Sequence, residues 1–177
     1  MIETATHSAD STKRLAAALA ELARPGDLLL LAGDLGAGKT AFTQGFGKAL
    51  GVEERITSPT FTLVSQYEGR LVLNHLDVYR LEQLEEVHHL GLGELLDEGG
   101  VTVIEWGDAI LPMLPASYLE IRFAFGKEDD DRDITFIPVG PRWTARNRAL
   151  TTALSLWLAP PFDTMPRPAS PDDDGAR

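Results

Sequence analysis

The sequence predicts an α/β fold in which a mixed sheet is flanked by helices in a three-layer arrangement. An apolar segment at 27–32 is followed by a glycine-rich loop and then by a helical pattern that includes Phe42, Phe46 and Leu50. Two later pairs of strand-like segments predict two antiparallel hairpins. The chain has 177 residues, of which 44% are hydrophobic, so it is long enough for one domain with a buried core.

The composition narrows the classes of function. The chain contains no cysteine, which excludes disulfides and thiolate chemistry. Its first residues lack the pattern of a signal peptide, and its apolar runs are shorter than the ~20 residues of a membrane span. We therefore expect a cytoplasmic protein without a membrane segment. The net charge of −11 would repel a phosphate backbone, so direct binding of nucleic acid is disfavoured.

The first predicted helix covers 8–23. Its apolar positions follow an i, i+3, i+4, i+7 spacing, at Leu15, Ala18, Leu19 and Leu22. Ser8, Asp10 and Ser11 are candidate N-caps, and Pro25-Gly26 ends the helix. The strand expected at 27–32 is apolar almost throughout, which is typical of a central strand covered on both faces.

The loop after this strand has the phosphate-binding pattern G-x-x-x-x-G-K-T at 33–40. Its glycines allow backbone N–H groups to surround an anion, and the next helix directs its partly positive N-terminus at that anion. Lys39 would reach the β- and γ-phosphates, and Thr40 would bind Mg²⁺. The predicted nucleotide-binding residues here are Gly33, Asp34, Leu35, Gly36, Ala37, Gly38, Lys39, Thr40 and Ala41.

A second polar segment, Thr-Ser-Pro-Thr-Phe at 57–61, follows the helix. In nucleotide switches, such hydroxyls help to hold Mg²⁺ and the γ-phosphate. Ser58 and Thr60 are therefore further candidates for nucleotide binding, although an ordinary polar turn also explains this segment.

The first predicted hairpin pairs 61–67 with 71–78 and ends near Asp77. A carboxylate at the end of an apolar strand after a P-loop is the Walker B arrangement, in which the acid holds Mg²⁺. His75 lies two residues earlier on the same strand face. We interpret it as a partly buried histidine rather than as a catalyst.

A broken helix is expected at 81–93, with a solvated face of acidic residues and histidines. The next strand, 101–106, carries Glu105 near its end, where a glutamate could orient or deprotonate an attacking water. A surface charge is the alternative. We expect Trp106 to pack in the core or against a partner rather than to stack on a base.

The second predicted hairpin pairs 118–125 with 132–139 around an acidic turn. One last helix is expected to carry its apolar residues on a single face, at Trp143, Leu150, Leu154, Trp157 and Leu158. Its arginines, Arg142, Arg146 and Arg148, are interpreted as a solvated basic face, and contact with an acidic partner or a phosphate is the alternative. The segment 159–177 is rich in proline and aspartate and predicts a disordered tail beyond a domain at 1–158.

Four ordered motifs, GDLGAGKT, TSPTF, HLDVYRL and IEW, resemble those of the TsaE (YjeE) family of small bacterial P-loop ATPases. The resemblance covers about residues 8–138 and implies a P-loop NTPase-like fold. It also implies ATP, ADP and Mg²⁺ as ligands. That family acts in making threonylcarbamoyladenosine in tRNA, in complex with the threonylcarbamoyl-transferase and its companion subunit (TsaD/TsaB-like). ATP hydrolysis then supports repeated turnover by the transferase, and tRNA is reached only through the complex.

The resemblance also implies roles for single residues. Lys39 and Thr40 match the Walker A pair, and Ser58 and Thr60 match the switch-like segment. Asp77 matches the metal-linked acid, followed by Tyr79 and Arg80, and Glu105 with Trp106 matches the pair placed at catalysis. The implied catalytic residues are Glu105 and Lys39, and the implied metal ligands are Thr40, Asp77 and Glu105. Gly107 stands where the family more often has proline, which loosens the turn after Glu105.

Two other classes of function use the same P-loop. A small-molecule or nucleotide kinase would need an acceptor pocket and basic residues that close over the phosphoryl group, and no arginine-rich insertion appears. A nucleotide-controlled binding module with negligible turnover would also fit the hydroxyl-rich segment. A GTPase is disfavoured because no Asn-Lys-x-Asp segment follows.

Overall fold

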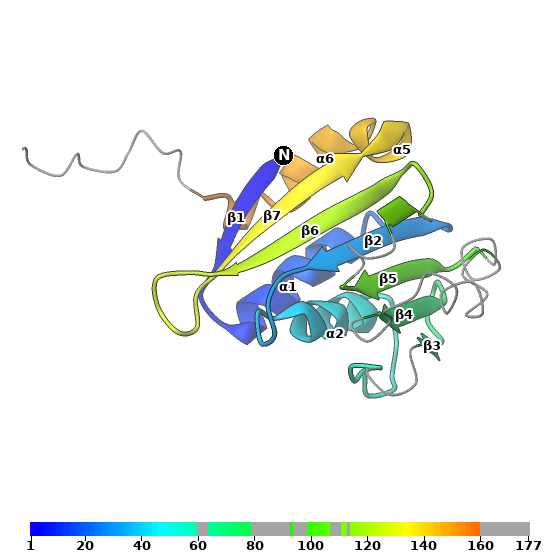
Figure 1. Cartoon of the computed structure of the whole chain (residues 1–177), viewed down its shortest axis with the longest axis horizontal. Coiled ribbons are helices and arrows are strands. Elements are labelled where there is room, and N and C mark those ends of the chain that lie inside the picture. The colour runs from blue at the N-terminus through cyan, green and yellow to red at the C-terminus, as the bar shows by residue number, and fades with distance from the viewer. Residues whose placement is uncertain (60–63, 79–92, 94–98, 107–110, 113, 160–177) are drawn as a thin grey trace, which may run out of the picture.

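The computed structural model describes residues 1–59, 64–78, 93, 99–106, 111–112 and 114–159. Within them, one seven-stranded sheet has the order β1-β7-β6-β2-β5-β4-β3, with β3 at one edge and β1 at the other (Figure 1). The strands are β1 (Ile2–Thr6), β2 (Asp27–Ala32), β3 (Val64–Tyr67), β4 (Leu73–Asp77), β5 (Val101–Glu105), β6 (Tyr118–Phe125) and β7 (Arg132–Val139).

Strand β2 is the centre of the sheet, as its apolar sequence predicts. It pairs in parallel with β5 on one side and with β6 on the other. Strand β4 pairs in parallel with the outer side of β5. Because parallel strands end at the same edge of a sheet, the ends of β2, β4 and β5 meet beside the loop that follows β2.

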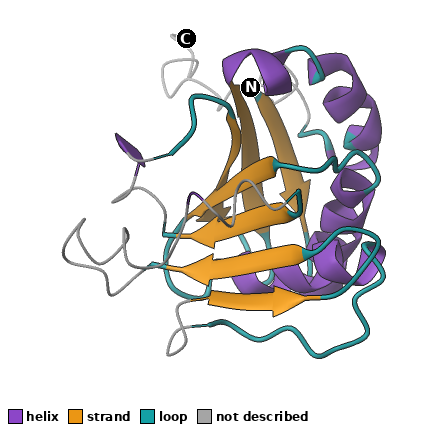
Figure 2. Cartoon of the chain, turned by 90° about the vertical axis from the view of Figure 1, so that its right-hand side faces the viewer, coloured by secondary structure: helices purple, strands orange, loops and turns teal. Residues whose placement is uncertain are grey.

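Helices α1 (Ala9–Ala20) and α2 (Lys39–Ala49) pack against one face of the sheet (Figure 2). The Ser8 side chain caps α1 by accepting a hydrogen bond from the backbone N–H of Ser11 at 3.1 Å. Gly45 of α2 faces α1, where an added Cβ would lie 2.3 Å from the carbonyl oxygen of Lys13. The two helices thus approach closely, and α1 packs against the helix that follows the loop after β2.

The two predicted hairpins are confirmed as antiparallel pairs. Strands β6 and β7 have the expected bounds, and β3 with β4 forms the shorter hairpin. The mixed sheet with flanking helices confirms the α/β class. Except for Gly93, the helix expected at 81–93 lies outside the described residues. The tail from residue 160 onward also lies outside them.

The two chain ends differ from what the sequence predicts. Strand β1, which pairs with β7 at the sheet edge, is not predicted, and the expectation of one last helix is wrong. The single last helix is instead α5 (Gly140–Thr144), α6 (Asn147–Ala153) and a 3₁₀ turn (Ser155–Trp157). Leu158, expected on the buried helix face, is 43% exposed and forms a β-bridge with Thr4.

The last helix breaks at Arg146, which is buried. The expectation of a solvated basic face is therefore wrong for this arginine. Arg146 lies between α5 and α6, is only 8% exposed, and donates to both carboxylate oxygens of Asp27 at 2.8 and 2.7 Å. Its guanidinium also stacks 3.8 Å from the ring centroid of Trp143. Arg142 is 3.2 Å from the same carboxylate, whereas Arg148 is exposed. The buried ion pair ties the C-terminal helices to the first residue of β2.

No helix among the described residues is long and apolar enough to cross a membrane.

Candidate nucleotide-binding site

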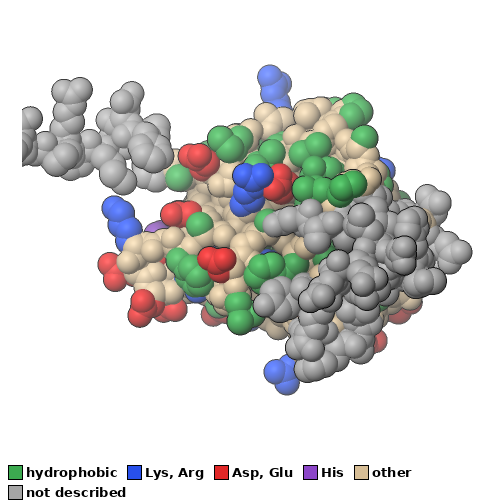
Figure 3. Space-filling model, viewed as in Figure 1, with side chains coloured by type: hydrophobic (Ala, Val, Ile, Leu, Met, Phe, Trp, Pro, Cys, Tyr) green, Lys and Arg blue, Asp and Glu red, His purple; other side chains and the backbone are tan. Residues whose placement is uncertain are grey.

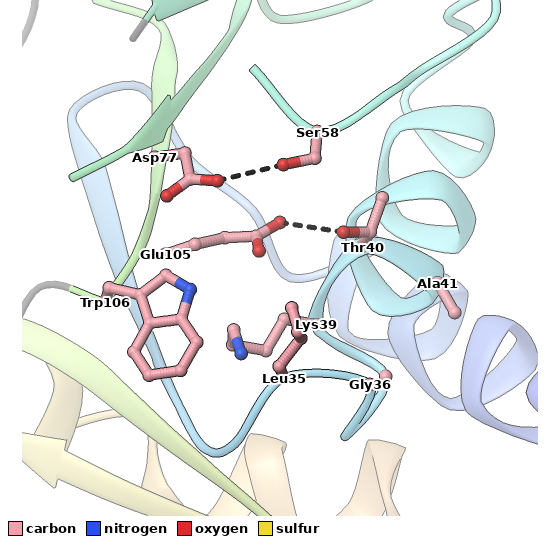
Figure 4. Close-up of a pocket in the computed structure, with 10 residues that line it drawn as sticks. Leu35, Gly36, Lys39, Thr40, Ala41, Ser58, Asp77, Glu105 and Trp106 are labelled. Carbon is pink, nitrogen blue, oxygen red and sulfur yellow. Dashed lines mark hydrogen bonds between the residues drawn. The ribbon is translucent and has the colours of Figure 1, made fainter. Parts of the chain in front are cut away.

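A cavity of about 440 Å³ opens where β2, β4 and β5 end (Figure 4). This volume is in the range of small-molecule sites. The residues that line it come from the loop after β2, the start of α2, the segment before β3 and the ends of β4 and β5: Leu35, Gly36, Gly38, Lys39, Thr40, Ala41, Ser58, Asp77, Glu105 and Trp106.

The loop backbone explains its glycines. Gly36 and Gly38 have φ angles of +80° and +105°, a region that L side chains rarely adopt, although an added Cβ would meet no atom there. Gly38 is also the N-cap of α2 and has no side chain to cap the first turn. The first residues of α2, Lys39, Thr40 and Ala41, line the cavity, where the N–H groups of a helix N-terminus can donate to an anion.

Lys39 is the first residue of α2 and folds back over the loop. Its Nζ donates to the carbonyl oxygens of Gly33 at 2.7 Å and Asp34 at 3.0 Å. The same nitrogen lies 3.9 Å from the centroid of the Trp106 ring. Only 4% of Lys39 is exposed, so its positive charge is concentrated inside the cavity. A phosphate in the cavity would accept a stronger hydrogen bond from Lys39 than the neutral carbonyls do.

Glu105 ends β5 and is 3% exposed, so it is not a surface charge. Its Oε1 accepts a hydrogen bond from Thr40 Oγ1 at 3.3 Å (Figure 4). The same oxygen lies 2.9 Å from Nε2 of His75. Strand β5 lies directly beside β2, which brings this carboxylate next to the first turn of α2. A carboxylate held there can orient a water or contact a metal ion at the phosphates.

Asp77 ends β4 and is also buried. It lies opposite Glu105 in the parallel pairing of β4 and β5, and its Oδ2 accepts from Ser58 Oγ at 2.9 Å. The cavity thus gathers carboxylate and hydroxyl oxygens, the ligand type that Mg²⁺ prefers. Among the described residues, no group of three or more histidine or acidic side chains could hold a metal ion alone. Magnesium in phosphate-transfer sites commonly takes one or two carboxylates together with substrate phosphates.

Most of the predicted site residues line this cavity, but Gly33, Asp34 and Ala37 are not among the lining residues. Gly33 and Asp34 contribute carbonyl oxygens that hold Lys39. Ala37 is fully buried and packs in the main core below the loop. Thr60 lies outside the described residues, as do Tyr79, Arg80 and Gly107 of the matched motifs.

Trp106 was expected to pack in the core or against a partner, and the structure also places its ring in the cavity. It packs against a small cluster on the second face of the sheet, yet its ring also lines the cavity beside Lys39. Its φ of 63° is the only positive value at a non-glycine residue among the described residues. A bulky residue rarely adopts this conformation, and such strain gathers at functional sites.

Two further contacts had no signal in the sequence. His75 is fully buried and touches Glu105, a residue 30 positions away. Arg132, at the start of β7, reaches the loop carbonyl of Gly36 with Nη2 at 3.4 Å. Only the strand order brings these residues to the loop, and spacing along the chain does not reveal strand order.

Comparisons with known proteins agree with this geometry. Residues 6–134 match the family described as "Threonylcarbamoyl adenosine biosynthesis protein TsaE". The tRNA threonylcarbamoyladenosine biosynthesis protein TsaE of Bacillus subtilis is 45% identical over 139 residues, which cover 78% of this chain and 86% of that protein. The protein of the same name from Treponema pallidum is 42% identical over 73% of this chain and 96% of its own length. The crystal structure of YdiB from Bacillus subtilis superposes with a TM-score of 0.75 at 38% identity, covering 86% of this chain and 97% of that one.

Proposed function

Because the chain belongs to the TsaE family of tRNA threonylcarbamoyladenosine biosynthesis proteins, we propose that it is a Mg²⁺-dependent ATPase of that pathway. It binds and hydrolyses ATP in the cytoplasm, in complex with the threonylcarbamoyl-transferase and its companion subunit (TsaD/TsaB-like). The observation that carries this proposal is the hydrogen bond between Thr40 of the P-loop and the buried carboxylate of Glu105. It joins the phosphate-binding loop to the acid that would assist hydrolysis.

Binding of the triphosphate is supported by three features of the loop. The glycines at positive φ leave the backbone open to an anion, and the N-terminus of α2 supplies N–H donors. Lys39 supplies a nearly enclosed positive charge beside them. Together these features favour a polyphosphate chain over a single carboxylate or sulfate, because they lie along the loop rather than at one point.

Hydrolysis is supported by the two acids at the ends of β4 and β5. Glu105 is within reach of the P-loop and can orient or deprotonate the attacking water. Asp77 and Ser58 form a second oxygen pair across the cavity that is suited to the metal side of the phosphates. Bound Mg²⁺ would neutralise the charge that develops on the transferred phosphoryl group.

Action on tRNA is proposed to be indirect. The net charge is −11. On the face shown in Figure 3, the described Lys and Arg side chains are scattered and form no continuous patch. An acidic surface of this kind is repelled by a phosphate backbone. Contact through a transferase complex avoids that repulsion.

A kinase remains the alternative with the same loop, but the described residues give it less support. No arginine is among the described residues that line the cavity. A kinase would use such a group to close over the transferred phosphoryl.

A reconstituted reaction tests the proposed function. The protein is mixed with the transferase, its companion subunit, ATP, Mg²⁺ and an unmodified tRNA, in the presence of the threonylcarbamoyl donor. We expect tRNA modification to continue beyond one turnover per transferase, with ATP converted to ADP and phosphate. The exposed-glutamate variant Glu3→Gln is the control and should behave as wild type. Repeated turnover without this protein, or a phosphorylated acceptor in place of free phosphate, would contradict the proposal.

A further inference from the structure

We propose that His75 is a positioning residue of the ATPase site, whose Nε2–H holds the Glu105 carboxylate in place beside Thr40. The inference rests on the proposed function, since it assigns a role within the same site. His75 lies in β4, which pairs directly with β5, the strand that carries Glu105.

The location of His75 separates it from solvent. Its side chain is 0% exposed and lies on the face of β4 that also carries Leu73 and Asp77. In the parallel register, His75 is opposite Val103, two residues before Glu105. Leu73 and Val103 belong to the main core, so the imidazole lies at the polar end of an otherwise apolar layer.

The hydrogen bonds of the ring define which nitrogen donates. Nε2 lies 2.9 Å from Oε1 of Glu105. Nδ1 is buried and has no hydrogen-bond partner among the described residues. A hydrogen on Nδ1 would be a buried donor without an acceptor, which is unfavourable. The hydrogen is therefore assigned to Nε2, and His75 donates to the carboxylate.

Glu105 is consequently held from two sides. Oε1 accepts from Thr40 on α2 and from His75 on β4, so both the loop helix and the sheet fix one carboxylate oxygen. The side chain extends from the end of β5 across the cavity toward Thr40 (Figure 4). A glutamate has three rotatable bonds, and the hydrogen bond from the buried histidine restricts them before any ligand arrives. Pre-set geometry of this kind matters most for the chemical step, because small misplacements of a reacting group reduce rate strongly.

Leucine and glutamine variants distinguish positioning from filling of the core. His75→Leu introduces an apolar side chain of related size, which fills the space but removes the donor. His75→Gln retains an amide N–H near the place of Nε2. We expect His75→Leu to lower kcat for ATP about 10- to 100-fold while changing KM and the Kd of Mg²⁺·ADP less than about threefold. His75→Gln should recover most of kcat.

A spectroscopic measurement follows the same contact without activity. In ¹⁵N-histidine-labelled protein, NMR should show a hydrogen bound to Nε2 of His75, and Glu105→Ala should shift this Nε2–H resonance. This measurement does not use the leucine variant, so it tests the contact even if that variant fails to fold.

The outcomes separate the two proposals. An inactive wild-type protein in the reconstituted complex would overturn the ATPase function itself. An active wild type together with an equally active His75→Leu variant would overturn only the positioning role. The role would also be overturned by a loss of kcat that His75→Gln does not recover, or by a histidine resonance that is unchanged in Glu105→Ala.

Discussion

Asp77 and Glu105 lie directly opposite each other at the ends of two parallel strands, yet each accepts a hydrogen bond from a different segment. Glu105 accepts from Thr40 of the P-loop helix, whereas Asp77 accepts from Ser58 in the segment before β3. The two carboxylates would therefore face different parts of a nucleotide bound in the cavity. We infer a division of roles, in which Glu105 serves the attacking water and Asp77 serves the metal side.

Replacing Asp77 by asparagine tests this division. The amide keeps the shape of the side chain but removes the negative charge that favours a divalent cation. We expect Asp77→Asn to raise the Mg²⁺ concentration for half-maximal ATP hydrolysis about tenfold, with part of kcat regained at saturating Mg²⁺. Mg²⁺ titrations of the steady-state rate measure this effect. Asp133→Asn, an exposed aspartate of β7, is the control, and equal Mg²⁺ curves for the two variants would refute the role of Asp77.

Lys39 is expected to contribute to binding of the triphosphate. Lys39→Met keeps the length of the side chain but removes the charge that lies beside the loop carbonyls. Charge-assisted hydrogen bonds contribute about 1.5–3 kcal/mol, so the Kd of a slowly hydrolysed ATP analogue should rise roughly 10- to 100-fold. Calorimetric titration provides that Kd. Lys48→Met changes an exposed lysine on the same helix and should leave the Kd unchanged. An unchanged Kd in Lys39→Met would exclude the loop as the phosphate site.

The buried ion pair between Arg146 and Asp27 is expected to stabilise the fold. Arg146→Ala leaves the Asp27 carboxylate buried at the start of β2 with only the partly exposed Arg142 beside it. Breaking a buried pair costs about 3–5 kcal/mol of the free energy of unfolding. Arg148→Ala removes an exposed arginine two residues away and should change that free energy by less than about 0.5 kcal/mol. Urea denaturation of the two variants gives the comparison. Similar midpoints would show that the pair adds no stability.

The local elements were predictable, whereas the contacts between them were not. The sequence pattern predicts β2, the P-loop and the β6–β7 hairpin because periodicity and turn chemistry are properties of neighbouring residues. The sequence does not predict strand β1, because five residues at a sheet edge carry little periodic signal. The last helix was expected to be continuous because the pattern of Trp143, Leu150 and Leu154 is helical. The break at Arg146 depends on Asp27, a partner 119 residues away.

The candidate site shows the same limit. Motif spacing identified Lys39, Thr40, Asp77 and Glu105 as one set, and the structure brings them to one cavity. Motif spacing does not show that β5 lies between β2 and β4. This strand order decides which carboxylate contacts Thr40. The contact of His75 with Glu105 follows from the same order.

Single-turnover hydrolysis by Glu105→Gln in the reconstituted transferase complex is the most direct test of the central claim. Glutamine retains the shape and a hydrogen-bond acceptor for Thr40 but cannot take a proton from water. We expect the hydrolysis rate to fall by about 100-fold or more, with the Kd for Mg²⁺·ATP within about threefold of wild type. A Glu105→Gln protein that binds ATP and hydrolyses it at the wild-type rate would contradict the assignment of this cavity as an ATPase site with Glu105 at its centre.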